Sequence, residues 1–518
     1  MPFVSYFNVL GDNIAVKDTS SFPSVNVAEH LNEYTSLNDL INALAPTNTL
    51  YFPAGNYSFN VSLTGVPVSI IADPNAIFAP ATTGHMMYVT ASPSFKWCGG
   101  SFQSGTYTTR TISSEFETSF IKVTASKNVW ISDISVTSTL QNNIYLLENT
   151  NIILNNISIN GITGTGIGIY QNNENVIANN IRCENVLIPT TLSYAYGFAC
   201  GYTNYTQTLK PVKNIAVTNF YANNCEWEGF DCHGATFLSL TNAEINNCPR
   251  SITAYIDSRP QYDPTVEFIS ATFKNIKIKN TAPSKTADIC TLYHYANTPT
   301  RSFKHITYED CEIHNPYGGN DVFAPGLSKT YTLRNFTLTS DSAVCRSIAA
   351  FQCASVTLDN VRIDGLSLTS TAFRFGGCHI FAEKSPFLTS NPALIVSNSL
   401  NYIEGSFMSF NSSNTLMRAQ TLLLQGTTLT NKFTQDLALS LAPGSNFPIT
   451  ATTTDDIHFT YTSTVYLLPL YTRITNDANG SVRYIIESDT SGFTLNAPMN
   501  SGDNLRVYVC SANSLAET

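Results

Sequence analysis

The chain has 518 residues, of which 43% are hydrophobic and only 12% are charged, and its formal net charge is −10 at pH 7. This apolar content excludes global disorder, and the negative charge argues against nucleic-acid binding, which needs a basic face. No apolar run reaches roughly 18 residues, so we expect no membrane insertion. The first residues carry no basic segment followed by an apolar one, so we expect no secretory signal.

The first predicted element is a short helix over residues 35–44, TSLNDLINAL. A Thr or Ser precedes it as a cap, and its apolar residues recur at helical spacing. A strand-like stretch, LYFPAGNYSF (50–59), follows. We expect the helix to cover the end of a sheet that would otherwise leave an open edge.

The middle of the chain repeats a pattern of two alternating apolar runs separated by Asn or Asp, as in IILNNISINGIT (152–163) and NVIANNIRCENV (175–186). The residues between the two runs are Asp133, Asn156, Asn180, Asn219, Asn242, Asn275, Asp310, Asn335 and Asn360. Asn tolerates the left-handed backbone of a sharp corner, and its amide can hydrogen-bond the next corner. Most intervals between successive corner residues are 23–25 residues long, which predicts a parallel β-helix. Apolar residues recur at every second position along each run, which excludes helical repeats.

The order of helix, LYFPAGNYSF, short strands and Asn-cornered coils, over roughly residues 35–370, resembles the bacteriophage tailspikes of the pectate-lyase-like right-handed parallel β-helix superfamily. Such proteins often begin with a Gly-Asp-Gly and double-Asp segment, of which only GDN (11–13) and KDT (17–19) are present. The resemblance implies a homotrimer on the virion, attached to a phage tail or adaptor protein. It also implies that acids on or beside the helix face cut a bacterial surface polysaccharide.

Three intervals exceed the base period, and the extra residues (189–211, 255–267 and 282–301) predict loops that form walls around one coil. Tyrosine suits sugars, because its ring packs on C–H groups while its hydroxyl bonds outward. The aromatic and His candidates in the inserts are Tyr194, Tyr196, Tyr202, Tyr205, Tyr293, His294 and Tyr295. Stacking of these rings inside the coils is the alternative interpretation.

The coil between the inserts carries NNCEWEGFDCHGA (223–235), in which Glu226, Glu228 and Asp231 are the candidate catalytic acids. Glycoside hydrolysis needs one protonated and one ionised carboxyl group. Crowding of acids raises the pKa of one of them and supplies that difference. Gly229 permits a bend before Asp231. The alternative is that these acids only hydrogen-bond loop backbone.

Alternation along the strand turns Phe230 and Cys232 inward, so Asp231 and His233 should point outward. In addition to His233, the candidates for substrate binding in this region are Arg250, Tyr255, Asp257 and Arg259. Asp263 and Asp288 are weaker acid candidates, whereas His305, Glu309 and Asp310 are expected to be structural. The same groups allow a second chemistry, β-elimination from a uronic acid, with His233, Tyr255, Arg250 or Arg259 as base or carboxylate partner.

The twelve cysteines are scattered without CxxC pairs, so we expect buried free thiols and neither a metal nor a cofactor. After about residue 370 the coil pattern fades, and from about 450 runs such as SVRYIIES and NLRVYVCS alternate with turns. We therefore expect an N-terminal segment (1–48), the β-helix (49–370), a transition (371–449) and a β-sandwich-like module (450–518). The resemblance implies that this module serves trimerisation or carbohydrate binding.

The sequence as a whole predicts an all-β tailspike that hydrolyses a bacterial capsule, exopolysaccharide or O-antigen. Two alternatives stay open: a polysaccharide lyase acting on the same face, and a virion adhesin that binds glycan without cutting it.

Overall fold

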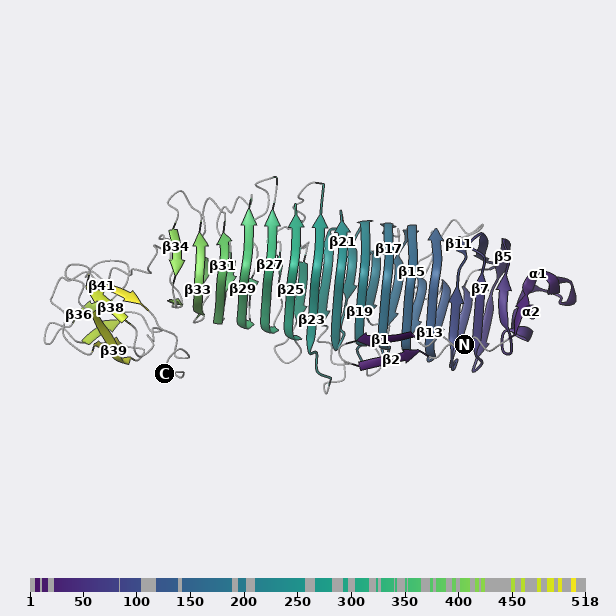
Figure 1. The fold of residues 1–518 in the computed structure, drawn as a ribbon, viewed down its shortest axis with the longest axis horizontal. Helices are drawn as coiled ribbons and strands as arrows, with labels where there is room; N and C mark the ends of the chain where they lie inside the picture. Colours follow the sequence, from purple (N-terminus) through teal and green to yellow (C-terminus); the bar gives the residue numbers. More distant parts are fainter. Residues whose placement is uncertain are drawn as a thin grey trace. The chain divides into compact units, whose positions relative to one another are not determined.

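The computed structural model shows that nearly all of the regular secondary structure of the described residues is β-strand (Figure 1). It describes residues 5–9, 12–16, 23–82, 84–103, 118–137, 142–188, 194–201, 210–256, 266–281, 292–296, 303–315, 323–324, 328–339, 341, 350–351, 353–364, 373–375, 379–387, 394–396, 401–409, 415–418, 421–423, 449–451, 458–461, 473–476, 482–488, 492–495 and 505–508. The chain divides into two compact units: Met1–Thr281 with Thr291–Lys304, and Ala282–Cys290 with His305–Thr518.

The first unit contains two parallel sheets. The long-strand sheet holds β3 (Ser24–Asn26), β4 (Thr49–Phe52), β5 (Gly55–Phe59), β7 (Val68–Ala72), β8 (Ala76–Pro80), β10 (Phe95–Cys98), β11 (Ser101–Gln103), β13 (Lys127–Thr137), β15 (Thr150–Thr163), β17 (Glu174–Leu187), β19 (Lys213–Cys225), β21 (Phe237–Asn246) and β23 (Ser270–Lys279). The short-strand sheet holds β6 (Val61–Thr64), β9 (His85–Thr90), β12 (Ser119–Thr124), β14 (Asn142–Leu147), β16 (Thr165–Tyr170), β18 (Tyr196–Gly201), β20 (Glu228–Cys232), β22 (Arg250–Ile256) and β24 (Leu292–Ala296). A separate antiparallel hairpin joins β1 (Ser5–Val9) to β2 (Asp12–Val16).

From β13 onward the chain alternates between these sheets, and each strand pairs in parallel with the strand one coil later. This is the topology of a parallel β-helix, so the predicted fold of the middle region is confirmed.

The second unit begins with further parallel strands. The long ones are β25 (Phe303–His314), of which the part from His305 onward belongs to this unit, β27 (Ser328–Thr339), β29 (Cys353–Asp364), β31 (His379–Phe387) and β33 (Asn401–Ser409). The short ones are β26 (Phe323–Ala324), β28 (Ala350–Phe351), β30 (Phe373–Phe375) and β32 (Leu394–Val396). On β33 two antiparallel strands follow, β34 (Thr415–Arg418) and β35 (Thr421–Leu423). Parallel pairing thus continues past residue 370.

The C-terminal strands pair antiparallel. They are β36 (Ile449–Ala451), β37 (His458–Tyr461), β38 (Arg473–Asn476), β39 (Val482–Ser488), β40 (Gly492–Leu495) and β41 (Leu505–Tyr508). Antiparallel pairing agrees with the predicted module, whereas its sandwich architecture and its role stay predictions.

The predicted corner residues all adopt the left-handed conformation, with φ between 48° and 58°. Their side chains form hydrogen-bonded ladders from coil to coil: Asn156 Nδ2 donates to Asp133 Oδ1 (2.8 Å), and Asn180 Nδ2 donates to Asn156 Oδ1 (2.9 Å). A second ladder, which the sequence analysis did not identify, runs along the start of the long strands through Asn151 and Asn175 (3.1 Å). Each corner therefore supplies both the bend and a link to its neighbour.

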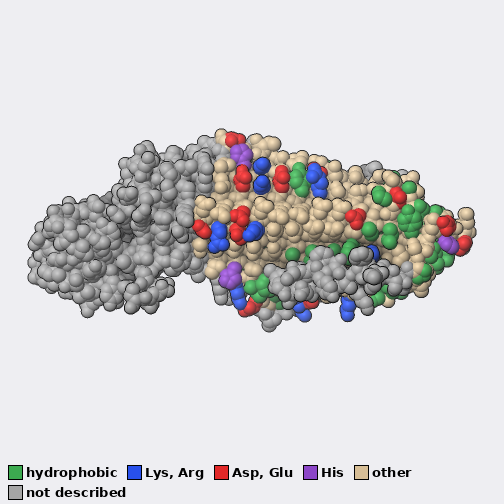
Figure 2. All heavy atoms as spheres, viewed as in Figure 1, with side chains coloured by type: hydrophobic (Ala, Val, Ile, Leu, Met, Phe, Trp, Pro, Cys, Tyr) green, Lys and Arg blue, Asp and Glu red, His purple; other side chains and the backbone are tan. Residues whose placement is uncertain are grey.

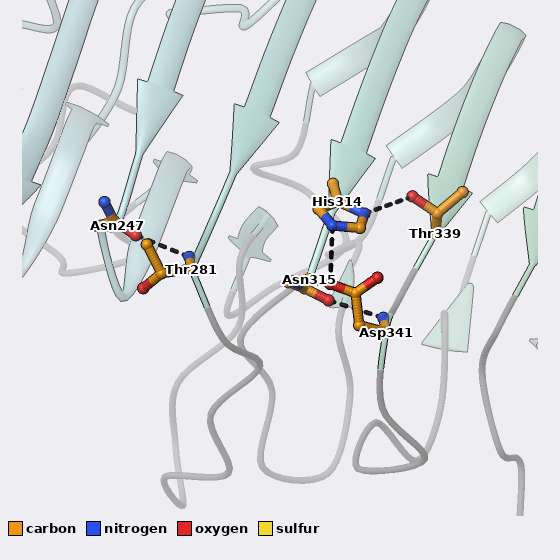
Figure 3. Close-up of polar contacts among 6 residues, drawn as sticks. All are labelled: Asn247, Thr281, His314, Asn315, Thr339 and Asp341. Carbon is orange, nitrogen blue, oxygen red and sulfur yellow. Dashed lines mark hydrogen bonds and ion pairs between the residues drawn. The ribbon is translucent and has the colours of Figure 1, made fainter.

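Other Asn side chains bind the backbone of the adjacent coil (Figure 3). In the first unit Asn247 Oδ1 accepts from the Thr281 N–H at 2.9 Å. In the second unit Asn315 Oδ1 accepts from the Asp341 N–H at 2.8 Å, while the Asp341 carboxylate lies 3.2 Å from His314 Nε2. These contacts fix the points at which the chain leaves one coil and enters the next.

The core of the first unit consists of apolar columns, one side chain per coil. Ile167, Phe198, Phe230 and Ile252 are in register along the short-strand sheet and fully buried. The rings of Phe198 and Phe230 stack with centroids 5.3 Å apart. Such an aromatic pair contributes about 1 kcal/mol beyond area burial.

The predicted N-terminal helix is confirmed as α2 (Leu37–Leu44), whose cap is Ser36. Ser36 Oγ accepts from the Asp39 N–H at 3.1 Å, and Leu40 and Ile41 are buried. Before it lie α1 (Val27–His30) and a 3-10 turn at Leu31–Glu33. The helix contacts β5 and β6, and Figure 1 shows it at the end of the stack of strands. It covers that end as expected.

Uncharged polar side chains and backbone make up most of the described surface in Figure 2, with charges in short rows. No helix in the described part of the chain is long and apolar enough to cross a membrane. The seven cysteines described with their side chains are free, and six of them are buried, as predicted.

The corner ladder yields a stability prediction. Replacing Asn156 by Ala places a Cβ-bearing residue without a polar side chain at φ 53° and removes two ladder hydrogen bonds. We expect a loss of about 1–3 kcal/mol in unfolding free energy, seen as a lower apparent Tm. Asn156→Gly, which keeps the backbone conformation but lacks the ladder, should lose less. Equal stability of Asn156→Ala and the wild type would contradict this role of the corner.

Candidate active site

Glu228 and Asp231, two of the three candidate acids, lie on β20, between β18 and β22 of the short-strand sheet. Parallel register places Glu228 between Tyr196 on one side and Arg250 on the other. The same register sets Asp231 beside Thr253. Three successive coils therefore contribute to one surface.

The Glu228 and Asp231 carboxyl groups lie close together although Gly229 and Phe230 separate them in the chain. Phe230 and Cys232 are fully buried, as expected from alternation. A Cβ at Gly229 would lie 2.8 Å from Ile245 Cγ2, so only glycine allows this close approach. Regular alternation would put Glu228 on the side opposite to Asp231. The register omits Gly229, as it omits Gly166 and Gly197 in the preceding coils, and this break in the alternation lets the two carboxyl groups come within 4.8 Å of one another.

Glu228, Asp231 and His233 form a compact group. Each offers one oxygen or nitrogen atom within 4.8 Å of the others. His233 Nε2 lies 2.9 Å from Asp231 Oδ1. The Glu228 and Asp231 side chains are 1% and 3% exposed, whereas His233 is 33% exposed. His233 is therefore the member of this group that reaches solvent.

Arg250 holds the other side of Glu228. Its Nη1 donates to Glu228 Oε1 at 3.0 Å, and its guanidinium lies over the Trp227 ring, 4.6 Å from the centroid. Glu228 Oε2 is buried, and no N–H or hydroxyl group of the described residues donates to it. Sequence reasoning assigned no role to Trp227, although its place between two acids was a usable signal.

The two carboxyl groups have unequal proton affinities. Burial raises the pKa of Glu228 well above its usual range, and the neighbouring Asp231 charge raises it further, against the opposing charges of His233 and Arg250. Burial also raises the pKa of Asp231, to about 7, while a hydrogen bond with Glu228 and the charge of Arg250 lower it. Glu228 therefore keeps its proton to a higher pH than an ordinary glutamate does, and Asp231 is divided between its two forms near pH 7.

Glu226, the third acid of the predicted set, is not part of this group. Its side chain is exposed, and Oε2 accepts from the Ile188 N–H at 2.6 Å. Tyr196, by contrast, is half-buried beside Glu228, and its ring stacks on Tyr194 with centroids 5.3 Å apart. The structure thus joins two of the three acids to an aromatic pair from the first insert.

The remaining sequence candidates are placed less completely. Tyr202, Tyr205, Asp257, Arg259, Asp263 and Asp288 lie outside the described residues, and Tyr255, Tyr293, His294 and Tyr295 are described in their backbone only. Pairing of β22 with β24 sets Thr253 beside Tyr293 and Tyr255 beside Tyr295. Asp310 accepts from Asn335 at 2.7 Å and His305 contacts Thr330 at 2.8 Å, which agrees with the structural roles expected for them.

The group also has the spacing of a cation site, with two carboxylates and one imidazole. The Arg250 guanidinium on Glu228 Oε1 opposes a second positive charge there. The raised pKa of Glu228 also disfavours the ionised form that would bind a cation. The arrangement favours proton transfer over metal binding.

No family model and no curated protein matches the sequence. Among solved structures, the chain is similar to a family 28 exopolygalacturonase from Yersinia enterocolitica, with 12% identity, a TM-score of 0.39, and coverage of 76% of this chain and 80% of that one. It is similar to PfbA, a surface adhesin of Streptococcus pneumoniae (12%, TM-score 0.36, 83% and 97%). It is also similar to the tailspike gp49 of Acinetobacter baumannii bacteriophage Fri1, a capsular polysaccharide depolymerase (10%, TM-score 0.17, 97% and 86%).

These similar structures include both enzymes and an adhesin. None has an identity or TM-score that would transfer a function, so the chemistry of this chain has to follow from its own residues.

The raised pKa of Asp231 predicts a pH-dependent stability. The unfolded chain releases this proton near the ordinary value of 3.8, whereas the folded protein keeps it up to about 7. Stability is therefore lost as the pH rises between these values. Asp231→Asn avoids this loss, so its apparent Tm relative to wild type should increase from pH 4 to pH 8.

Thermal unfolding across that range tests the prediction. Glu244→Gln, which removes one exposed carboxylate on β21, is the matched control. A Tm difference for Asp231→Asn that is negative and the same at every pH would show that Asp231 stabilises the fold.

Proposed function

We propose that this protein is a glycoside hydrolase that depolymerises a bacterial surface polysaccharide at the Glu228–Asp231 pair. The observation that carries the proposal is the pair itself: two adjacent, almost fully buried carboxyl groups whose environments give them unequal proton affinities. Glycoside hydrolysis needs this difference, with one carboxyl group as proton donor and the other ionised.

Glu228 is the proposed general acid. Its Oε1 accepts the Arg250 hydrogen bond, which leaves Oε2 to carry the proton and to donate it to the leaving glycosidic oxygen. Arg250 fixes the orientation of this carboxyl group and is itself held by Trp227. When Glu228 gives up its proton, the nearby guanidinium stabilises the charge that forms.

Asp231 is the proposed second carboxylate. In its ionised form it either takes the proton of the attacking water or attacks the anomeric carbon itself. His233 lies 2.9 Å from Asp231 Oδ1 and supports the negative charge while its exposed edge faces solvent. Tyr196, beside Glu228, offers a ring on which a sugar can pack.

The resemblance of the coils to tailspikes supports a proposal about where the protein acts. We propose that the protein acts as a homotrimer on a phage virion, joined to the tail or an adaptor protein during host adsorption. In this proposal the C-terminal antiparallel strands take part in trimerisation or carbohydrate binding.

Two variants test the chemistry. With a panel of purified capsular and O-antigen polysaccharides, Asp231→Asn and Glu228→Gln should each lower the rate of reducing-end formation by about 10²–10⁴-fold. Glu244→Gln should cut at the wild-type rate. The rate of reducing-end formation by Glu226→Gln, compared with that of the wild type, decides whether Glu226 contributes to cleavage.

The products separate the alternatives. New reducing ends without ultraviolet absorbance identify a hydrolase, and products that absorb near roughly 235 nm through a new C=C bond identify a lyase. Full activity in both Asp231→Asn and Glu228→Gln would overturn the proposed site. Binding without any cleavage would support the adhesin.

The pKa values also predict the pH profile. Asp231 has to be ionised, so the rate should rise as the pH passes through about 7. The rate should fall at a more alkaline pH, where Glu228 loses its proton. Initial rates across pH 4–10 measure both limbs, and an acid limb near the ordinary carboxyl value would contradict the assignment of Asp231.

A further inference from the structure

The column of side chains that contains Asp231 continues through the earlier coils of the short-strand sheet. In parallel register it runs through Tyr88, Lys122, Tyr145, Gly168, Ala199 and Asp231. Lys122 is thus four rungs from Asp231, or roughly 19 Å at the usual rung spacing. Both side chains leave the sheet from the same face, opposite to the buried neighbours Ile121 and Phe230.

Lys122 is a half-buried cation held by rings. Its Nζ lies 5.1 Å from the Tyr88 ring centroid and 5.0 Å from that of Tyr145. It also lies 3.1 Å from His85 Nε2, while His85 Nδ1 is 2.9 Å from Ser119 Oγ. None of the carboxylates that the structure describes pairs with this ammonium group.

The His85 ring acts as an acceptor in this group. Burial, with the charge of Lys122, lowers the pKa of His85 to about 4, so the imidazole is neutral at physiological pH. The group therefore carries one positive charge, that of Lys122. Removing an ammonium group from water costs free energy, and contacts with aromatic rings and a neutral imidazole offset only part of that cost. An anion at this position would complete the compensation.

We propose that Lys122, with His85, Tyr88 and Tyr145, forms a subsite for an anionic substituent of the polysaccharide. The inference rests on the proposed function, because the same column leads to the Glu228–Asp231 pair. The distance between the two positions corresponds to several sugar units. The half-buried Tyr88 gives a ring face for a sugar, whereas Tyr145 is buried between Lys122 and Tyr170 and holds the cation. The substrate class is thereby narrowed to acidic polysaccharides, in which a uronate or another acidic group meets Lys122.

Affinity measurements in an Asp231→Asn background test this without cleavage. The probes are acidic capsular polysaccharides, each paired with its carboxyl-reduced form, and binding is followed by calorimetry. Lys122→Met, which keeps the length of the side chain between the rings, should weaken binding of an acidic polysaccharide about tenfold or more, as expected for loss of a charge-assisted contact. Lys122→Arg should keep most of the affinity.

Two controls isolate the charge at this site. Lys127→Met, which removes an exposed lysine on β13 of the long-strand sheet, should bind as the parent does. Carboxyl reduction of the polysaccharide should abolish the difference between Lys122→Met and the parent. Because burial disfavours the Lys122 cation, Lys122→Met should unfold at or above the parent temperature.

The outcomes separate this inference from the proposed function. Equal affinity of Lys122→Met and the parent, or binding confined to neutral polysaccharides, would overturn the subsite and leave hydrolysis at Glu228 and Asp231 intact. An acidic polysaccharide that needs Lys122 for binding but is never cut by the wild type would support the subsite and overturn the hydrolase.

Discussion

Register between coils is the constraint on which the described architecture depends. From β13 onward each long strand of the first unit bends at a left-handed Asn or Asp residue, and the amide of Asn156 or Asn180 donates to the corner side chain one coil before it. A parallel sheet tolerates no slip here, because a shift of one residue would turn the apolar columns outward. The ladder therefore holds the same alternation from coil to coil.

This register turns distances along the chain into columns across the sheet. Glu228, Asp231 and Arg250 meet because β20 and β22 are adjacent rungs. The register of the short strands omits Gly166, Gly197 and Gly229 in successive coils, so the same break recurs from coil to coil. On β20 the two carboxyl groups lie on either side of this break, and each offers an oxygen within 4.8 Å of the other.

Burial of the Glu228 and Asp231 carboxyl groups lowers the stability of the fold and favours proton transfer. Taking carboxyl groups out of water raises their pKa values, and the folded protein loses stability as the pH rises through the range in which they ionise. The apolar columns and ladders supply the stability that permits this strained arrangement. Active sites commonly concentrate such unfavourable but reactive groups. The Glu228–Asp231 pair has that character, whereas the exposed Glu226 does not.

Local rules were enough to predict much of this protein. Alternation assigned Phe230 and Cys232 to the core, and the preference of Asn for left-handed backbone identified the corners, because both properties depend on neighbouring residues alone. The cap at Ser36 followed in the same way. The separation of Glu228 from Glu226 did not follow, since both share one parity along the strand. It was decided by the turn between β19 and β20, in which Glu226 lies, whereas Glu228 begins β20. Likewise, the alignment of Lys122 with Asp231 depends on the register across several coils with inserts of different length, which only the tertiary structure sets.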